Sequence, residues 1–230
     1  MEDTKKNKIN IGLAIIVAGV IIAGAILLNG TKAPNDQKTD NKEAPTIKAE
    51  INISETDHIR GNVDSKVIIV EYSDTECPYC KVFQTTMQKV MTEKGNEIAW
   101  VYRHFPIAQL HPKAFKESIA TECAFEQGGN EMFWKYIDEV YSRTESNNKL
   151  PVEELPKIAS DLKLDVALFN TCINSDKFNE KVNSSLAGGS KIGVSGTPKS
   201  FILKDGKVID TIDGAYPYEV VIQKIEAALK

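Results

Sequence analysis

The stretch that decides the fold is Cys77-Pro78-Tyr79-Cys80, together with the residues on either side of it. The β-rich run Val67-Ile68-Ile69-Val70-Glu71-Tyr72 leads into it, and a run with helical periodicity, Val82 to Met91, leads out. Two cysteines at this spacing, placed at a strand-to-helix junction, can close a small disulfide ring and open it again. The pattern therefore predicts a site that exchanges electrons with other thiols.

The two thiols are expected to differ in acidity. As the N-cap of the outgoing helix, Cys77 would lie against the free amide groups of the first turn, which lower the pKa of a thiol below its usual value of about 8.5. Pro78 at the first helical position costs no hydrogen bond. Cys80 lies one turn deeper, so its thiol should stay protonated. We therefore expect Cys77 to be the nucleophile and Cys80 the resolving cysteine.

Glu71 lies six residues before Cys77, on a strand whose neighbouring residues are apolar. A half-buried carboxyl group there would have a raised pKa and could exchange the proton that Cys80 loses. The alternative is a charged residue at the exposed end of a strand, and the sequence favours neither interpretation.

Two other uses of the cysteine motif are disfavoured. A zinc site takes four ligands, and a lone Cys-x-x-Cys supplies two. A purely structural disulfide at this spacing is strained and rarely useful. We expect no metal, and no cofactor beyond the redox-active Cys77–Cys80 disulfide itself.

The composition is that of a globular protein, with 42% hydrophobic and 26% charged residues in a chain of 230. The net charge of −4 gives no basic footprint, so nucleic acid is not an expected partner. Residues 9–28 carry no charge and are long enough to cross a bilayer as a helix. They predict a transmembrane anchor after a short cytoplasmic tail, residues 1–8. A cleaved signal peptide is the alternative, although its apolar region is usually shorter.

Residues 29–50 are polar and charged, which predicts a flexible linker. Lysines flank the apolar stretch almost evenly, so they do not fix its orientation. The cysteines indicate the orientation better. All four follow that stretch, and an even number of cysteines with disulfide-like spacing suits an oxidising compartment. We expect a single-pass protein of the cell membrane whose C-terminal domain is extracytoplasmic.

Residues 51–230 are expected to form one α/β domain whose sheet is interrupted by a helical insertion at about residues 111–192. The elements before it are strands at 67–72 and 97–103 and a helix from Cys80 to about Glu93, ended by Gly95. The insertion holds a helix from His111 stopped by Gly128-Gly129, then helices at 131–143, 152–162, 166–173 and 177–192, with Asp165 and Asp176 as N-caps. After it come a hairpin with strands 200–203 and 207–212 around Asp205-Gly206, and a helix from Tyr218 to Ala228.

Three further residues are singled out. Pro198 lies at the entrance of a returning strand, where a loop proline is the simplest interpretation, since only about 5–6% of such bonds are cis. Cys123 and Cys172 fall on faces of two insertion helices that helix packing could bring together. A bridge between them would contribute about 4 kcal/mol in the chain-entropy model. Two separate buried thiols are the alternative, and outside the cytoplasm the bridge is favoured.

From about His58 to the C-terminus, the chain resembles the DsbA-like branch of the thioredoxin superfamily. The matching blocks, in order, are Gly61-Asn62, Val70-Glu71-Tyr72-Ser73-Asp74, Cys77-Pro78-Tyr79-Cys80, Tyr102-Arg103-His104-Phe105-Pro106, His111-Pro112, Glu122-Cys123-Ala124-Phe125-Glu126-Gln127-Gly128, Phe133-Trp134, Phe169-Asn170-Thr171-Cys172 and Val194-Ser195-Gly196-Thr197-Pro198. So many blocks in the right order are specific, whereas a lone Cys-x-x-Cys would not be.

The resemblance implies a thioredoxin fold with an all-helical insertion. The apolar residues 9–28 separately predict an N-terminal transmembrane helix before it. The resemblance also implies a cis bond between Thr197 and Pro198 facing the active-site sulfurs. Pro78, Tyr79, Thr197 and Pro198 would then contact substrate, with the Thr197 backbone pairing with an extended chain. Members of the family oxidise cysteines of exported polypeptides and are reoxidised by a membrane quinone-linked thiol oxidase of the DsbB or VKOR type. Several carry a second disulfide in the insertion, matching Cys123 and Cys172.

The chain departs from the best-known oxidases at three positions. Tyr79 replaces a histidine, which should make the thiolate less favoured and the disulfide less oxidising. Thr197 is also found among isomerases, and Lys199 stands where an uncharged residue is commoner. We expect a membrane-anchored oxidoreductase that donates the Cys77–Cys80 disulfide to exported proteins. The alternatives are a reductase or isomerase using the same site, and an adaptor that binds extended peptides without catalysis.

Overall fold

The computed structural model of this chain describes residues 50–230. The expected cytoplasmic tail at 1–8, the anchor at 9–28 and all but the last residue of the 29–50 linker lie outside the described residues. Over residues 50–230, the helices all fall short of the length and apolarity that crossing a membrane requires.

The strand-to-helix junction predicted around the cysteines is present. Strand β2, Val67–Ser73, leads into helix α2, Pro78–Lys94, and Gly95 ends this helix. The chain then returns as strand β3, Ile98–His104, which pairs with β2 in parallel. This β-α-β unit places the carboxyl end of β2 and the start of α2 at one edge of the sheet.

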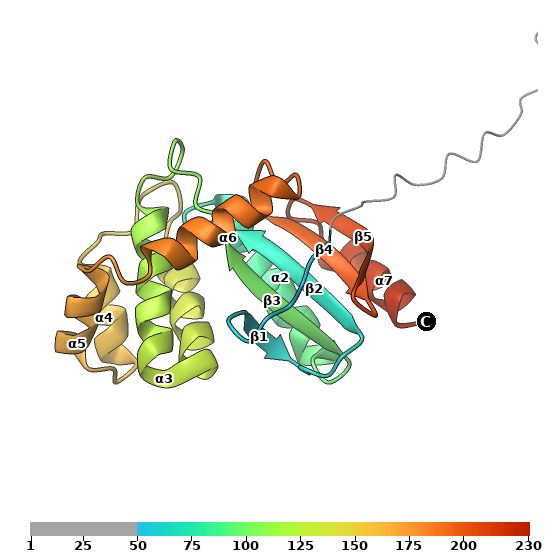
Figure 1. Cartoon of the computed structure of the whole chain (residues 1–230), viewed down its shortest axis with the longest axis horizontal. Helices are drawn as coiled ribbons and strands as arrows, with labels where there is room; N and C mark the ends of the chain where they lie inside the picture. Colours follow the sequence, from blue (N-terminus) through green and yellow to red (C-terminus); the bar gives the residue numbers. More distant parts are fainter. Residues whose placement is uncertain (1–49) are drawn as a thin grey trace, which may run out of the picture. The chain divides into compact units, whose positions relative to one another are not determined.

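The sheet has five strands in the order β1-β3-β2-β4-β5 (Figure 1). Strands β4, Lys199–Lys204, and β5, Lys207–Asp213, form the predicted hairpin, and β4 pairs antiparallel with β2. Helix α7, Tyr218–Leu229, closes the chain. Strand β1, His58–Gly61, pairs antiparallel with β3 and was not predicted, because four residues are too few to show an alternating pattern.

The helical insertion lies between β3 and β4 and begins with α3, Ala114–Arg143. The expected helix end at Gly128-Gly129 is confirmed, because this range consists of two helices that meet at a kink there. Gly128 and Gly129 leave helical geometry, with φ of −141° and 64°, but the chain resumes the helix after them. A positive φ costs glycine little, so the pair can end one helix and let the helix predicted at 131–143 begin directly after it.

Three shorter helices complete the insertion: α4, Glu154–Asp161, α5, Val166–Ile173, and α6, Asn179–Lys191. Asp165 caps α5 as expected, its side chain accepting hydrogen bonds from the amides of Ala167 and Leu168. Asp176 does not cap α6, whose N-cap is Phe178. The Asp176 carboxylate instead accepts a hydrogen bond from the side-chain amide of Asn179, so it does not bond to the backbone amides of the first turn.

The sheet separates two apolar layers, and the helical insertion has a third of its own. On one face Ile69, Trp100 and Ile202 pack against α2 and α7, and on the other Val70, Val101 and Phe201 pack beneath α6. Figure 1 shows α6 running from the insertion across the sheet. Gly189 allows this close approach, because a Cβ there would lie 2.8 Å from the ring of Tyr72.

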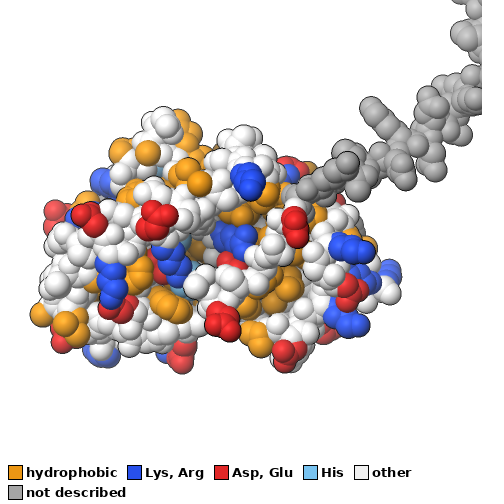
Figure 2. Space-filling view, viewed as in Figure 1, with side chains coloured by type: hydrophobic (Ala, Val, Ile, Leu, Met, Phe, Trp, Pro, Cys, Tyr) orange, Lys and Arg blue, Asp and Glu red, His pale blue; other side chains and the backbone are white. Residues whose placement is uncertain are grey.

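Charged side chains of both signs are mixed on the surface. Figure 2 shows Lys and Arg side chains interspersed with Asp and Glu on the face in view, without a continuous area of either sign. A protein that binds the phosphate backbone presents a basic stripe instead. The face in view therefore carries no footprint for nucleic acid.

Candidate active site

Cys77 and Cys80 lie at the β2–α2 junction that the sequence predicts. Cys77 is the N-cap of α2, and Pro78 occupies the first turn, where its missing N–H costs nothing. Cys77 is 6% exposed and Cys80 is fully buried, and both are free thiols here. The structure thus brings the two sulfurs together in the reduced, dithiol state.

The environments of the two thiols push their pKa values in opposite directions. Hydrogen bonds from the Cys80 thiol and from the first-turn amides of α2 lower the pKa of Cys77 to about 6. Burial, together with the hydrogen bond to Cys77 and the charge on it, raises the pKa of Cys80 well above its ordinary value. At neutral pH, Cys77 is therefore the thiolate and Cys80 carries the proton.

The loop before β4 faces the Cys77 sulfur. The Thr197–Pro198 peptide bond is cis, and the Cys77 thiol lies 3.5 Å from the Thr197 carbonyl oxygen. Because Pro198 has no N–H, the backbone of Thr197 is the last group before β4 that can pair with an added strand. An extended peptide beside Thr197 would therefore pass the reactive sulfur.

The outer surface of the first helical turn is apolar. Tyr79 is 66% exposed and Val82 is 57% exposed, although both side chains are hydrophobic. Tyr79 lies two residues and Val82 five residues after Cys77, so apolar side chains are exposed close to the reactive sulfur. Exposed apolar groups next to a reactive atom are typical of a surface that contacts another protein.

Glu71 lies inside the protein and not at an exposed strand end. Its side chain is fully buried, and the indole nitrogen of Trp100 donates a 2.9 Å hydrogen bond to one carboxyl oxygen. Burial raises the pKa of Glu71 to about 7. Its charge also acts on the Cys80 thiol, which places the carboxyl group within electrostatic reach of the buried sulfur. A group that titrates near neutrality is suited to exchanging a proton.

Buried hydroxyl groups surround the inner sulfur. The Tyr141 hydroxyl lies 3.0 Å from the hydroxyl of Ser73 and 3.1 Å from that of Tyr102. The backbone amide of Asp74 contacts the Cys80 sulfur at 3.5 Å. Tyr141 comes from α3, so the helical insertion contributes directly to the environment of Cys80.

A second set of carboxylates, which sequence reasoning missed, holds the segment just before Cys77. The Asp74 carboxylate accepts hydrogen bonds from the Ile107 amide at 2.8 Å and from His111 Nδ1 at 3.0 Å. The Glu76 carboxylate accepts from the amides of Asn148 and Leu150. The Asp74 bonds tie the active-site segment to the loop before α3, and the Glu76 bonds tie it to the loop that follows α3. The one sign of this arrangement in the sequence was that two acidic residues, Asp74 and Glu76, lie shortly before Cys77.

Cys123 on α3 and Cys172 on α5 form a disulfide, with their Cα atoms 5.8 Å apart. It closes a sequence separation of 49 residues inside the insertion. The bridge lies in the apolar cluster of the insertion, whereas Cys77 and Cys80 belong to the cluster between the sheet and α2. The two cysteine pairs are therefore separate in the fold.

A redox-type Cys-x-x-Cys at a strand-to-helix junction, opposite a cis-proline and beside a helical insertion, defines a class of protein. This class is the thiol–disulfide oxidoreductases of DsbA-like architecture. The sequence model of the family described as thioredoxin matches residues 53–221. The chain belongs to the thioredoxin family.

Solved structures share the fold. DsbA2 of Pseudomonas aeruginosa superimposes with a TM-score of 0.65 at 22% identity, over 76% of this chain and 96% of that one. BdbD of Bacillus subtilis, in its oxidised form, gives a TM-score of 0.66 at 18% identity, over 75% and 92%. A variant of α-DsbA1 from Wolbachia pipientis gives 0.68 at 20% identity, over 80% and 96%. At these identities, the likeness establishes the fold.

Curated relatives are much longer proteins. The Na(+)/H(+) antiporter NhaA of Herminiimonas arsenicoxydans is 33% identical over 174 residues, which is 76% of this chain and 26% of that protein. NhaA 1 of Mycolicibacterium gilvum is 29% identical over 150 residues, 64% of this chain and 23% of that protein. The chain thus spans about a quarter of the length of the curated relatives it matches.

Proposed function

We propose that this chain is a membrane-anchored, extracytoplasmic oxidoreductase that introduces disulfides into exported polypeptides through Cys77 and Cys80. The observation that carries the proposal is the opposite shift of the two thiol pKa values beside the cis Thr197–Pro198 bond. A thiolate that is favoured in the folded protein stabilises the reduced state. The matching disulfide is therefore more oxidising than one between ordinary thiols.

The reaction begins with the Cys77–Cys80 disulfide. A substrate thiolate attacks the Cys77 sulfur, the Cys77–Cys80 bond breaks, and Cys80 leaves as a thiolate and takes a proton. A second substrate thiolate then attacks the substrate sulfur of the mixed disulfide. This step forms the substrate disulfide and releases Cys77 as a thiolate. Two electrons pass from the substrate to the protein.

Glu71 is proposed as the proton donor to Cys80 in this direction and the acceptor when the disulfide re-forms. Its pKa of about 7 means that both protonation states are populated near neutral pH. Its complete burial keeps the proton away from bulk water. This role is that of a relay, because the carboxyl group does not bond to the reacting sulfurs.

The proposed substrates are reduced, unfolded polypeptides that bind in extended form. The Thr197 backbone would pair with the substrate chain, while Pro78, Tyr79 and Pro198 would contact its side chains. The exposed side chain of Tyr79 supports this assignment. The proposed partner for reoxidation is a membrane quinone-linked thiol oxidase of the DsbB or VKOR type. An anchor at residues 9–28 would keep the domain at the membrane where such a partner resides.

The alternative direction, as a reductase or isomerase, has one observation in its favour. Hydrogen bonds from Cys80, Thr197 and the first-turn amides lower the pKa of Cys77, and Tyr79 stands where the best-known oxidases have histidine. A neighbouring imidazolium would make the disulfide more oxidising than this arrangement does. The redox potential separates the two directions.

The test is equilibration of the full-length chain with glutathione buffers of graded ratio, followed by alkylation and mass measurement. A potential above about −200 mV, toward the value of about −120 mV for DsbA, is the expected result. A potential near the thioredoxin value of about −270 mV would overturn the oxidase assignment and favour a reductase.

A further inference from the structure

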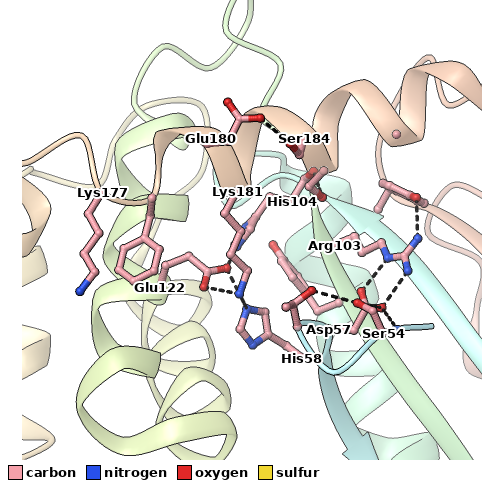
Figure 3. Close-up of a pocket in the computed structure, with 16 residues that line it drawn as sticks. Ser54, Asp57, His58, Arg103, His104, Glu122, Lys177, Glu180, Lys181 and Ser184 are labelled. Atoms are coloured by element: carbon pink, nitrogen blue, oxygen red, sulfur yellow. Dashed lines mark hydrogen bonds and ion pairs between the residues drawn. The ribbon is translucent and has the colours of Figure 1, made fainter. Parts of the chain in front are cut away.

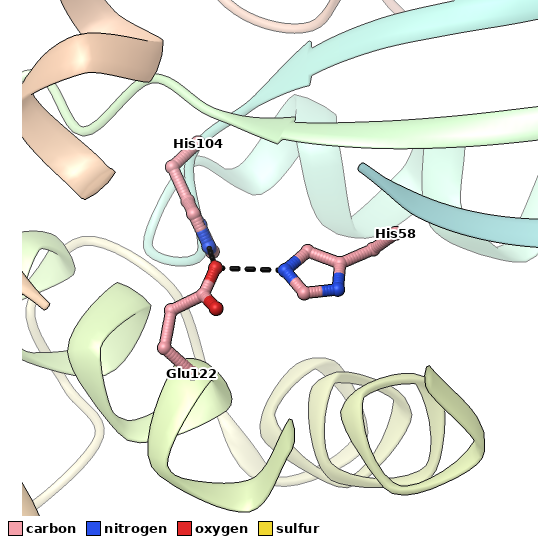
Figure 4. Close-up of side chains that lie close together, drawn as sticks. All are labelled: His58, His104 and Glu122. Carbon is pink, nitrogen blue, oxygen red and sulfur yellow. Dashed lines mark hydrogen bonds and ion pairs between the residues drawn. The ribbon is translucent and has the colours of Figure 1, made fainter. Parts of the chain in front are cut away.

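Two buried imidazoles and a buried carboxylate converge away from the cysteines (Figure 4). His58 Nε2 lies 2.7 Å from Glu122 Oε1, and His104 Nε2 lies 2.9 Å from the same oxygen. The three side chains are 2%, 2% and 0% exposed, respectively. His58 comes from β1, His104 from the end of β3 and Glu122 from α3, so three separate elements supply one cluster.

Packing fixes the direction of these side chains. The His58 ring is stacked on Phe133, with centroids 3.5 Å apart and an interplanar angle of 7°. The edge of Phe125 holds it from another side. The His104 ring is held edge-on between Tyr102 and Phe133. The two Nε2 atoms are therefore preset toward the carboxylate by aromatic contacts.

We propose that His58, His104 and Glu122 form a binding site for a transition-metal dication of the Zn²⁺ type. Two imidazole nitrogens and one carboxylate oxygen are a ligand set that suits Zn²⁺, whereas Ca²⁺ and Mg²⁺ prefer oxygen alone. One atom from each residue lies within 4.8 Å of the others. Bonds of about 2.0–2.2 Å need the ligand atoms about 3.5 Å apart, so the Glu122 carboxylate would have to move back from its present distances of 2.7 and 2.9 Å to admit an ion between it and the fixed rings.

Lys181 on α6 now supplies the positive charge at this cluster (Figure 3). Its Nζ lies 2.7 Å from Glu122 Oε2 and 3.1 Å from His58 Nε2. The side chain is 28% exposed, so it can swing outward without opening the core. A metal ion would displace the Lys181 ammonium group and would itself supply the positive charge beside the Glu122 carboxylate.

An open cavity of about 610 Å³ borders the cluster and gives an ion a route to it. His58, His104, Glu122 and Lys181 all line this cavity, as Figure 3 shows. Water from the cavity can fill the fourth coordination position, as in sites with three protein ligands. A bound ion would join the sheet to the helical insertion, because its ligands come from both. The expected consequence is a more stable contact between the two parts.

The test is a calorimetric titration of the oxidised full-length chain with Zn²⁺. In this form Cys77 and Cys80 are joined, so their sulfurs cannot bind the metal as thiolates. We expect one Zn²⁺ per chain and a higher melting temperature with the ion bound. In a parallel titration, Co²⁺ should give the visible absorption bands of a four-coordinate site. An oxidised chain that binds neither ion with unit stoichiometry would overturn the proposal.

Variants locate the bound ion. Glu122→Gln should weaken Zn²⁺ binding by about 100-fold or more, whereas Glu131→Gln, an exposed position on the same helix, should leave it unchanged. Lys181→Met removes the competing ammonium and should tighten binding by about tenfold. Because Lys181 is partly exposed, that variant should fold even if Glu122→Gln does not. Unchanged affinity in either Glu122→Gln or Lys181→Met would show that the metal binds elsewhere.

Discussion

The Cys77 thiol contacts the carbonyl oxygen of Thr197 at 3.5 Å, although the two residues are 120 positions apart in the chain. One belongs to the start of α2 and the other to the cis-proline loop before β4. The contact places the proposed nucleophile beside the backbone that would pair with an extended peptide. The proposed chemistry and the proposed recognition of peptides therefore share one edge of the sheet.

The first prediction concerns the division of labour between the two thiols. Cys80→Ser, incubated with a disulfide-bonded peptide, should accumulate a stable mixed disulfide through Cys77, because no resolving thiol remains. Non-reducing gels and mass spectrometry would detect the adduct. Cys77→Ser is the matched control and should form none, since Cys80 is fully buried and protonated. A Cys80→Ser chain that traps no peptide would favour the non-catalytic adaptor.

The second prediction concerns Glu71. Glu71→Gln should slow the closing of the Cys77–Cys80 disulfide from a mixed disulfide by about 100-fold, because the buried acceptor for the Cys80 proton is lost. In the unaltered chain, this rate should rise as the pH passes about 7, since Glu71 accepts a proton only when ionised. Stopped-flow measurement of the leaving thiol across pH would show both effects.

The control for Glu71 is the same change at an exposed position. Glu219→Gln, on the first turn of α7, should leave the rate and its pH dependence unchanged. If Glu71→Gln retains the rise near pH 7, the proton of Cys80 goes elsewhere and the relay role is wrong.

The third prediction concerns the hydrogen bonds by which Glu76 holds the active-site segment to the helical insertion. Glu76→Ala removes a fully buried carboxylate and leaves the amides of Asn148 and Leu150 without their acceptor. The free energy of unfolding should fall by about 2–4 kcal/mol. Urea denaturation measures this change. Glu145→Ala, an exposed residue in the same loop, should change stability by no more than about 0.5 kcal/mol.

The fourth prediction separates the second disulfide from the chemistry. Replacing both Cys123 and Cys172 by alanine opens a loop with a sequence separation of 49 residues and should lower the free energy of unfolding by about 4 kcal/mol. The redox potential of Cys77–Cys80 should not change, because the two pairs lie in different apolar clusters. A shifted potential at unchanged folding would show that the pairs are linked.

Much of the fold could be predicted from local patterns. The hairpin around Asp205-Gly206 and the helix at Val166–Ile173 carry strong turn and capping signals, so their positions were predicted closely. The helix end at Gly128-Gly129 and the new helix after it were also predicted, because paired glycines are a strong local signal for a helix end. Strand β1 depends on pairing with β3, a long-range contact that no local pattern reveals.

The candidate site was predictable only where one motif held its parts. The roles of Cys77 and Cys80 followed from their spacing and the helix start, whereas the cis bond at Pro198 came from family resemblance alone. The burial of Glu71 was left open, because it depends on Trp100 from the neighbouring strand. The cluster of His58, His104 and Glu122 escaped notice, since its members are far apart in sequence and only the packed insertion joins them.

The most direct test of the account is the rate at which iodoacetamide alkylates Cys77 in the reduced chain as a function of pH, with the modified residue located by mass spectrometry. Only the thiolate reacts, so the rate follows ionisation. The account predicts a midpoint near pH 6, with Cys80 unmodified throughout. A midpoint at about 8.5, the value of an unassisted thiol, would contradict it.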